Sequence, residues 1–298
     1  MKNPSNRLSF NNEIKKNKRY SAFLILIVFI TLLILGYVIG FVMGPDYFLF
    51  IMILAIIISI SYILVGYYKS AEIAVKSVNA KKASREKYKQ YYDLVEGLTL
   101  ASGLPMPKLY ILEHNSINAF ASGRNPQNAI ICVTTGAIEK LEKRELEGVL
   151  SHELSHIANY DIRFMTLSAV LVGMIAILSE IFLRSLFWRG LTGGNSKDND
   201  NAVLMIVGIA LAILAPLFVI IVQLAISRKR EFSADASAVK FTRTPTGLIG
   251  ALSKIKNNSE LKVSGSISPL FLSKPSHAKE FFQTHPPLEK RIARLERL

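Results

Sequence analysis

The chain has 298 residues, 50% of them hydrophobic, and its mean hydropathy is +0.32. This apolar content excludes an intrinsically disordered chain. With 36 Lys and Arg against 22 Asp and Glu the net charge is +14, and the single cysteine, Cys132, excludes both an intrachain disulfide and a metal site built from several thiolates. Because the apolar residues are concentrated in a few runs, a membrane protein is the first hypothesis to test.

Four apolar runs have the length of a transmembrane helix, about 20 residues. They cover residues 22–43, 47–66, 164–183 and 202–226. The first two contain no charged residue, and the turn Gly44-Pro45-Asp46 joins them into a hairpin. The first run is too long for the apolar part of a cleaved signal peptide, so we expect it to be retained. The last two carry polar residues and a proline, which leaves a long buried core helix as the alternative.

The distribution of Lys and Arg orients these runs. Only 3 of the 36 lie between the third and fourth runs, whereas 33 lie before the first, between the second and third, or after the fourth. The positive-inside rule then places both termini and the middle segment in the cytoplasm, which predicts a multi-pass protein of the cell membrane with the lipid bilayer as a partner. The basic residues are spread over every inside segment without a recognised module, so nucleic-acid binding is not expected.

The runs divide the chain into four parts. We expect a cytoplasmic tail and transmembrane hairpin at 1–67, the first part of a cytoplasmic domain at 68–162, a second hairpin at 163–226 and the second part of the cytoplasmic domain at 227–298. The two cytoplasmic parts contain roughly 165 residues, enough for only one modest core, so we expect them to fold as one domain.

Local patterns predict the secondary structure of the first cytoplasmic part. Apolar residues at helical spacing predict helices over 69–101 and 138–160, and short apolar runs between turn residues predict strands over 108–113, 118–122 and 129–134. Cys132 falls on the last strand, where we expect a buried and inert thiol. The predicted fold is a mainly α, α+β membrane protein, with four transmembrane helices and a small β-sheet in its cytoplasmic domain.

The second of these helices carries the pattern His152-Glu-Leu-Ser-His156. Residues four apart lie one turn apart on the same face of a helix, so both imidazoles can bind one metal ion. Glu153 is placed to flank the metal and to hydrogen-bond a water molecule without being a ligand. The alternative is two ordinary histidines on a partly exposed helix.

A catalytic zinc ion needs a third protein ligand from an element that can pack beside this helix. Glu231 and Asp235 are also four residues apart, on a predicted helix that continues the fourth apolar run. Glu231 is the expected third ligand, and Asp235 is the expected acceptor for the second ring nitrogen of a ligating histidine. The alternative is an exposed acidic pair that forms ion pairs with neighbouring basic residues. Asp161 follows His156 closely, and we expect it either to orient a ligand or to cap the helix junction.

With these motifs in place, the sequence resembles the HtpX family of membrane-embedded zinc metalloproteases, relatives of the CAAX prenyl endopeptidases. The resemblance rests on the two-plus-two apolar runs, on His152-Glu-Leu-Ser-His156 with Asp161, on Arg230-Glu-Phe-Ser-Ala-Asp235, and on Thr284-His-Pro-Pro287 with Arg291. It implies a gluzincin-like protease domain, one zinc ion per subunit, and cleavage of misfolded or damaged membrane proteins in quality control and the stress response.

The resemblance also implies roles for further residues. The edge strand that pairs with the substrate backbone in gluzincins is similar to Asn118, Ala119, Phe120 and Ala121. A plain sheet strand is the alternative there. His285 would be an oxyanion donor, with Arg291 as a second candidate, whereas the residues alone fit a surface turn at His285 equally well. Glu153 would take the proton from the attacking water and pass it to the leaving amine.

Two other functions stay open on the sequence. A CAAX-type protease acting on prenylated peptides would keep the chemistry, but such enzymes have more than four spans. A channel or transporter with a regulatory metal site would need ionisable groups or broken helices near mid-membrane, where only Glu180, Pro216 and Gln223 are candidates. We therefore predict a membrane metalloendopeptidase, and the sequence leaves its oligomeric state and natural substrates open.

Overall fold

The computed structural model describes residues 10–169, 228–257 and 286–298. Its elements, in chain order, are α1 (Phe10–Met43), α2 (Pro45–Ser77), β1 (Lys81–Lys82), α3 (Lys89–Ser102), β2 (Lys108–Leu112), β3 (Ala119–Gly123), a 3₁₀ helix (Pro126–Asn128), β4 (Ala129–Thr134), α4 (Thr135–Lys140), α5 (Lys143–Ala158), α8 (Arg228–Thr242), α9 (Thr246–Asn257) and α10 (Leu288–Leu295). Most of the described residues are helical, as predicted.

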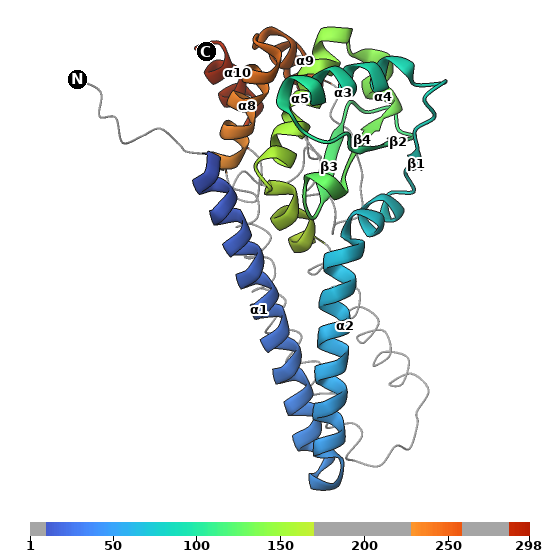
Figure 1. The fold of residues 1–298 in the computed structure, drawn as a ribbon, viewed down its shortest axis with the longest axis vertical. Coiled ribbons are helices and arrows are strands. Elements are labelled where there is room, and N and C mark those ends of the chain that lie inside the picture. Colours follow the sequence, from blue (N-terminus) through green and yellow to red (C-terminus); the bar gives the residue numbers. More distant parts are fainter. Residues whose placement is uncertain (1–9, 170–227, 258–285) are drawn as a thin grey trace, which may run out of the picture.

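Helices α1 and α2 form a long hairpin that extends away from the other elements (Figure 1). Gly44 between them takes a left-handed φ of 97°, and Pro45 begins α2. A Cβ atom on Gly36 would lie 2.3 Å from Cβ of Ala55, so a glycine is needed for the two helices to approach this closely. The tight hairpin predicted at residues 44–46 is confirmed.

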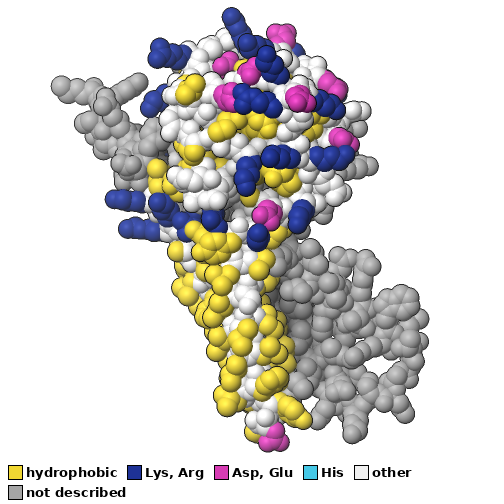
Figure 2. All heavy atoms as spheres, turned by 45° about the vertical axis from the view of Figure 1, so that its right-hand side comes forward, with side chains coloured by type: hydrophobic (Ala, Val, Ile, Leu, Met, Phe, Trp, Pro, Cys, Tyr) yellow, Lys and Arg dark blue, Asp and Glu magenta, His cyan; other side chains and the backbone are white. Residues whose placement is uncertain are grey.

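Both hairpin helices are long and apolar enough to cross a membrane. A core helix of a soluble protein would be mostly buried, whereas only 18% and 6% of their most apolar windows are buried. Figure 2 shows hydrophobic side chains covering the hairpin, while Lys and Arg gather on the rest of the molecule and at its junction with the hairpin. The predicted spans 164–183 and 202–226 lie outside the described residues, apart from 164–169.

The four described strands form one mixed sheet in the order β1-β2-β4-β3. Strands β2 and β4 are parallel, and β1 and β3 pair antiparallel with β2 and β4 respectively. Cys132 on β4 is buried, as predicted. Strand β3 lies at one edge of this sheet, with Ala121 opposite Ile131, and it packs against α5.

Two predicted helices are each interrupted in the structure. The predicted helix 69–101 is wrong in its middle, because Asn79 takes a left-handed φ of 55° that closes α2, and the chain then forms β1 before α3 begins. The predicted helix 138–160 is divided into α4 and α5. Glu142 and Glu145 form a reciprocal capping box at the start of α5, which begins a new helix there.

The core joins the two separated parts of the chain around α5. Leu146, Leu150 and Leu154 of α5 are fully buried and belong to one apolar cluster with β2, β3, β4 and α3. The same cluster contains buried residues from beyond residue 227, namely Ala238, Leu248, Ala251, Leu252, Ile255 and Leu295. Burial of these side chains is the main force that holds α8, α9 and α10 against α5.

The contact between α5 and α9 predicts the effect of one added methyl group. A Cβ atom on Gly148 would lie 2.4 Å from the backbone nitrogen of Leu248, so Gly148→Ala should push the helices apart and destabilise the protein by about 1–3 kcal/mol. Gly97 in α3 is exposed with nothing within 4 Å of an added Cβ, so Gly97→Ala should stabilise it by about 0.5–1 kcal/mol. Thermal unfolding of the full chain in detergent measures both, and shifts of the same sign would contradict the prediction.

Candidate metal centre

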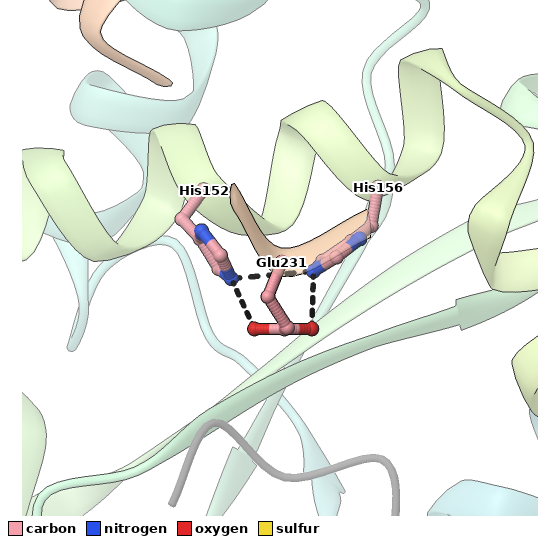
Figure 3. A group of neighbouring side chains, drawn as sticks. All are labelled: His152, His156 and Glu231. Atoms are coloured by element: carbon pink, nitrogen blue, oxygen red, sulfur yellow. Dashed lines mark hydrogen bonds and ion pairs between the residues drawn. The ribbon is translucent and has the colours of Figure 1, made fainter. Parts of the chain in front are cut away.

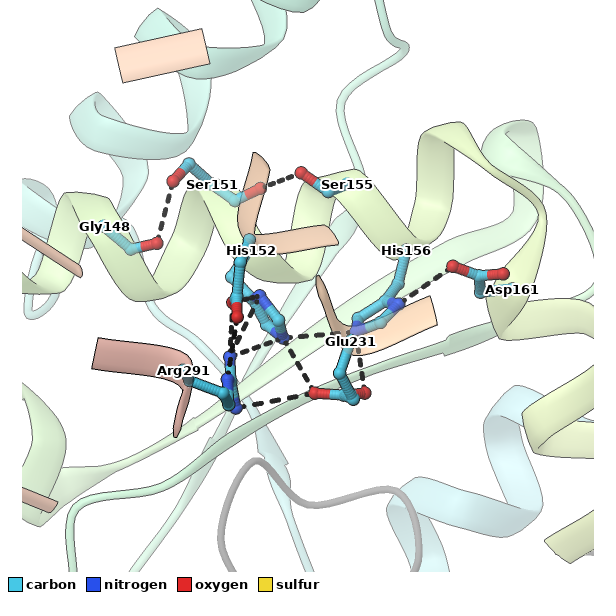
Figure 4. Close-up of polar contacts among 9 residues, drawn as sticks. Gly148, Ser151, His152, Ser155, His156, Asp161, Glu231 and Arg291 are labelled. Atoms are coloured by element: carbon cyan, nitrogen blue, oxygen red, sulfur yellow. Dashed lines mark hydrogen bonds and ion pairs between the residues drawn. The ribbon is translucent and has the colours of Figure 1, made fainter. Parts of the chain in front are cut away.

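Helix α5 presents His152 and His156 on one face, one turn apart. Every residue of α5 from Gly148 to Ile157 is buried, and the two imidazoles are only 1% and 4% exposed. The serines that directly precede the two histidines bond within the helix, since the hydroxyl of Ser151 donates to the carbonyl of Gly148 and that of Ser155 to the carbonyl of Ser151 (Figure 4). The alternative of two histidines on a partly exposed helix is therefore excluded.

Glu231 on α8 completes a group of three possible metal ligands (Figure 3). Its carboxylate oxygens lie 3.6 Å from Nε2 of His152 and 3.5 Å from Nε2 of His156, and the two Nε2 atoms are 3.2 Å apart. Ligand atoms arranged tetrahedrally at 2.0–2.1 Å from a zinc ion are about 3.3 Å apart. The three side chains therefore have the spacing and the chemistry of a tetrahedral site with one position left for a substrate or water.

The outer nitrogen of each imidazole contacts a second carboxylate. Asp235 Oδ1 lies 2.9 Å from Nδ1 of His152, and Asp161 Oδ2 lies 3.1 Å from Nδ1 of His156 (Figure 4). Such carboxylates fix the tautomer and the ring orientation of metal-binding histidines. With both Nδ1 atoms engaged in this way, both Nε2 atoms are directed towards Glu231.

Arg291 of α10 lies beside His152 and contacts Asp235 and Glu231. Its guanidinium donates two hydrogen bonds to Asp235, of 2.6 and 2.9 Å, and lies 3.4 Å from Oε2 of Glu231. Arg291 is fully buried. Burial raises the pKa of Asp235, but Arg291 and His152 lower it more, so this carboxyl group stays ionised. In this geometry Arg291 orients Asp235.

The centre carries an excess of buried negative charge. Four carboxyl groups, of Glu153, Asp161, Glu231 and Asp235, are buried near the imidazoles, and Arg230 and Arg291 are the buried guanidinium groups beside them in the described part of the chain. Burial and Arg291 lower the pKa of His152, but hydrogen bonds to Asp235 and Glu231 raise it to about 9. A divalent cation would replace that proton and offset the remaining charge.

Glu153 lies between the metal-ligand group and the edge strand β3. It is 3% exposed, and the backbone N–H of Ala121 on β3 donates a hydrogen bond to its carboxyl group. Burial raises the pKa of Glu153 above its usual value, although His152 and His156 partly oppose this shift. A carboxyl group with a raised pKa beside a metal site suits proton transfer near neutral pH.

Two sequence predictions concern the surroundings of this group. Ala119, Phe120 and Ala121 lie on β3, directly after Asn118, at the edge of the described sheet and next to α5. His285 lies outside the described residues.

One contact was not anticipated: the amide of Asn17 on α1 donates to Asp161 over 2.6 Å, across 144 residues of sequence. No local pattern marks Asn17, because it lies in a basic segment that resembles an ordinary membrane flank.

Three comparisons show which known proteins the chain is similar to. The model of peptidase family M48 matches residues 85–298. The protease HtpX homolog of Listeria monocytogenes serotype 4a (strain HCC23) is 43% identical over 301 residues, which cover 96% of this chain and 99% of that protein. The protease HtpX homolog of Dictyoglomus turgidum (strain DSM 6724 / Z-1310) is 38% identical over 96% of this chain and 94% of that protein. The crystal structure of S. mikatae Ste24p aligns with a TM-score of 0.49 at 19% identity, over 95% of this chain and 66% of that chain.

The different positions of Glu231 and Asp235 predict different effects on metal binding. Glu231→Gln removes a ligand and should weaken zinc binding by more than about a hundredfold, whereas Asp235→Asn removes only an outer partner and should weaken it by about 10–100-fold. Competition with a chromophoric chelator, on the purified full chain in detergent, measures both constants. Equal losses in the two variants would contradict the assignment of Glu231 as the ligand.

Proposed function

The chain belongs to peptidase family M48, and from this premise we propose that it is a zinc-dependent endopeptidase of the cell membrane that cleaves misfolded or damaged membrane proteins on the cytoplasmic side. Membership of the family makes it a membrane metalloprotease of the HtpX type. This sets aside the transporter, and the identity to HtpX homologs favours this function over that of a CAAX-type protease. The observation that carries the proposal is the tetrahedral spacing of three buried ligand atoms beside the buried Glu153.

We assign the metal to His152, His156 and Glu231. A zinc ion held there would polarise the scissile carbonyl and lower the pKa of a bound water towards neutrality. Two imidazoles and one carboxylate are a donor set typical of catalytic zinc sites in metallopeptidases. Asp235 and Asp161 hold the imidazoles in the tautomer that leaves Nε2 free for the metal, and Arg291 holds Asp235.

Glu153 is the proposed general base. Its buried carboxylate accepts the proton of the attacking water and then donates it to the nitrogen of the leaving amine as the peptide bond breaks. Burial raises the pKa of Glu153 above its usual value, which makes its carboxylate a stronger base for the proton of the water. The resemblance implies His285 as the oxyanion donor, and Arg291 is the second candidate. Nε and Nη2 of Arg291 donate to Asp235, while its Nη1 lies 3.4 Å from Oε2 of Glu231 without a hydrogen bond.

Substrate binding is proposed at β3. An edge strand offers backbone groups to an extended peptide and reads little of its side chains, which suits an enzyme that removes damaged proteins of many sequences. Strand β3 lies at the edge of the described sheet and contacts Glu153 through Ala121, so a peptide along residues 118–121 would pass beside the proposed base.

The proposed orientation follows from charge. Lys and Arg are concentrated outside the predicted spans, in the segments before, between and after the two hairpins. Figure 2 shows them around the part of the molecule that holds the metal centre. By the positive-inside rule, the centre and both termini are cytoplasmic in a multi-pass protein.

A single substitution separates metal binding from catalysis. Glu153→Gln keeps the size of the side chain and the three ligands, so the variant should bind zinc normally while its turnover falls by about 10²–10⁴-fold. The measurement is cleavage of an unfolded membrane protein by purified enzyme, together with the zinc content of the same sample. Glu147→Gln, six residues earlier on α5, is the control and should cleave like the wild type. Cleavage by Glu153→Gln at the wild-type rate would rule out the proposed base.

A further inference from the structure

The end of α1 nearest to the sheet contacts the metal centre through Asn17. This residue is 1% exposed, although it lies in a segment of four basic residues at the start of a membrane helix. Its amide nitrogen donates to Oδ1 of Asp161 over 2.6 Å and to the backbone carbonyl of Asn159 over 3.0 Å. Its burial and its two hydrogen bonds distinguish Asn17 from the polar residues that ordinarily flank a membrane helix.

Asp161 connects Asn17 to His156, one of the proposed metal ligands. Its other oxygen, Oδ2, lies 3.1 Å from Nδ1 of His156, so one carboxylate joins the amide of Asn17 to the imidazole. Figure 4 shows Asp161 on the outer side of His156, away from Glu231. Because the two oxygens of a carboxylate move together, the hydrogen bond on Oδ1 sets the direction of Oδ2 towards the ring.

The turn that carries Asp161 is strained. Tyr160 takes a left-handed φ of 59°, which is unfavourable for a bulky residue and turns the chain back after α5. The amide of Asn17 bonds to residues on both sides of Tyr160, and the ammonium of Lys18 lies over its ring at 4.6 Å. Two consecutive residues of α1 therefore hold the conformation that brings Asp161 to His156.

The side-chain oxygen of Asn17 makes a second connection. The guanidinium of Arg230 donates to it over 3.2 Å, and Arg230 directly precedes the proposed ligand Glu231 on α8. Asn17 thus contacts α8 through Arg230 and, through Asp161, the segment that directly follows α5. These contacts span 144 and 213 residues of sequence.

We propose that Asn17 is a positioning residue of the metal centre: through Asp161 it orients His156, so that the first membrane helix completes the outer shell of the site. The inference rests on the proposed zinc centre and adds to it a residue outside the protease motifs. The competing interpretation is that Asn17 only caps the end of α5 through the carbonyl of Asn159. The two interpretations differ in what they predict for metal affinity.

The main test compares two variants of Asn17 with a neighbour on the same helix. Asn17→Asp keeps the size of the side chain but faces Asp161 with a second carboxylate, and Asn17→Ala removes the amide. Both should weaken zinc binding by about tenfold, the lower end of the range for outer-shell partners. Ser21→Ala is the matched control, because Ser21 is also buried on α1 but its hydroxyl bonds only the carbonyl of Asn17 within the helix. Its zinc affinity should equal that of the wild type.

The readouts are the zinc dissociation constant, the visible absorption of the cobalt-loaded protein, and the melting temperature of the metal-free protein, all on the full chain in detergent. A change in the orientation of His156 alters the cobalt spectrum, whereas a lost cap lowers only the melting temperature. Lower melting temperatures with unchanged zinc affinity and cobalt spectrum in both Asn17 variants would overturn the proposal.

A double-mutant cycle tests the route through Asp161. If Asn17 acts through that carboxylate, Asn17→Ala should weaken zinc binding no further once Asp161→Asn is present, whereas independent effects would multiply and contradict the route. The wild type separates this inference from the proposed function. A wild-type chain that binds no zinc would refute the zinc centre itself, and normal zinc binding in the wild type and both Asn17 variants would refute only the role of Asn17.

Discussion

The packing of α8 along α5 is the contact on which the proposed metal centre depends. Glu231 reaches His152 and His156 only because apolar residues of α8 and α9 are buried against Leu146, Leu150 and their neighbours. The close approach of α9 at Gly148 keeps this arrangement tight. The imidazole and carboxylate atoms that could bind a metal therefore lie 3.2–3.6 Å from one another because a hydrophobic core holds the two segments together. Burial of that core supplies the free energy needed to bring several like charges together.

Around the possible ligands, each buried carboxylate contacts a cation, an imidazole or a hydrogen-bond donor. Arg291 neutralises part of the charge of Asp235 and Glu231, and the amide of Asn17 and the imidazole of His156 satisfy Asp161. This pattern explains why polar residues from α1, α5, α8 and α10 all converge on one place. A site with only the three ligands would leave its imidazoles free to rotate and its carboxylates unpaired, both of which weaken metal binding.

The sequence predicted those parts of the fold that depend on residue patterns within a few positions. The hairpin of α1 and α2, the three strands β2, β3 and β4, and the helical pairs 152/156 and 231/235 all follow from spacing within a few residues. It did not predict the break at Asn79, because the left-handed cap there is an asparagine rather than a glycine, or the start of α5, because its capping box uses glutamate. The contacts of Asn17 with Asp161 and of Arg291 with Asp235 were out of reach, since they arise from tertiary packing across 144 and 56 residues of sequence.

The order of the centre's residues along the chain bears on how the enzyme matures. A ribosome synthesises Asn17 first, then the two histidines, then Glu231 and Asp235, and Arg291 after all of them. Until α10 docks, Asp235 and Glu231 lack the guanidinium that compensates their charge. The site thus acquires its full set of buried contacts only after the last described helix has been synthesised and has packed against α8.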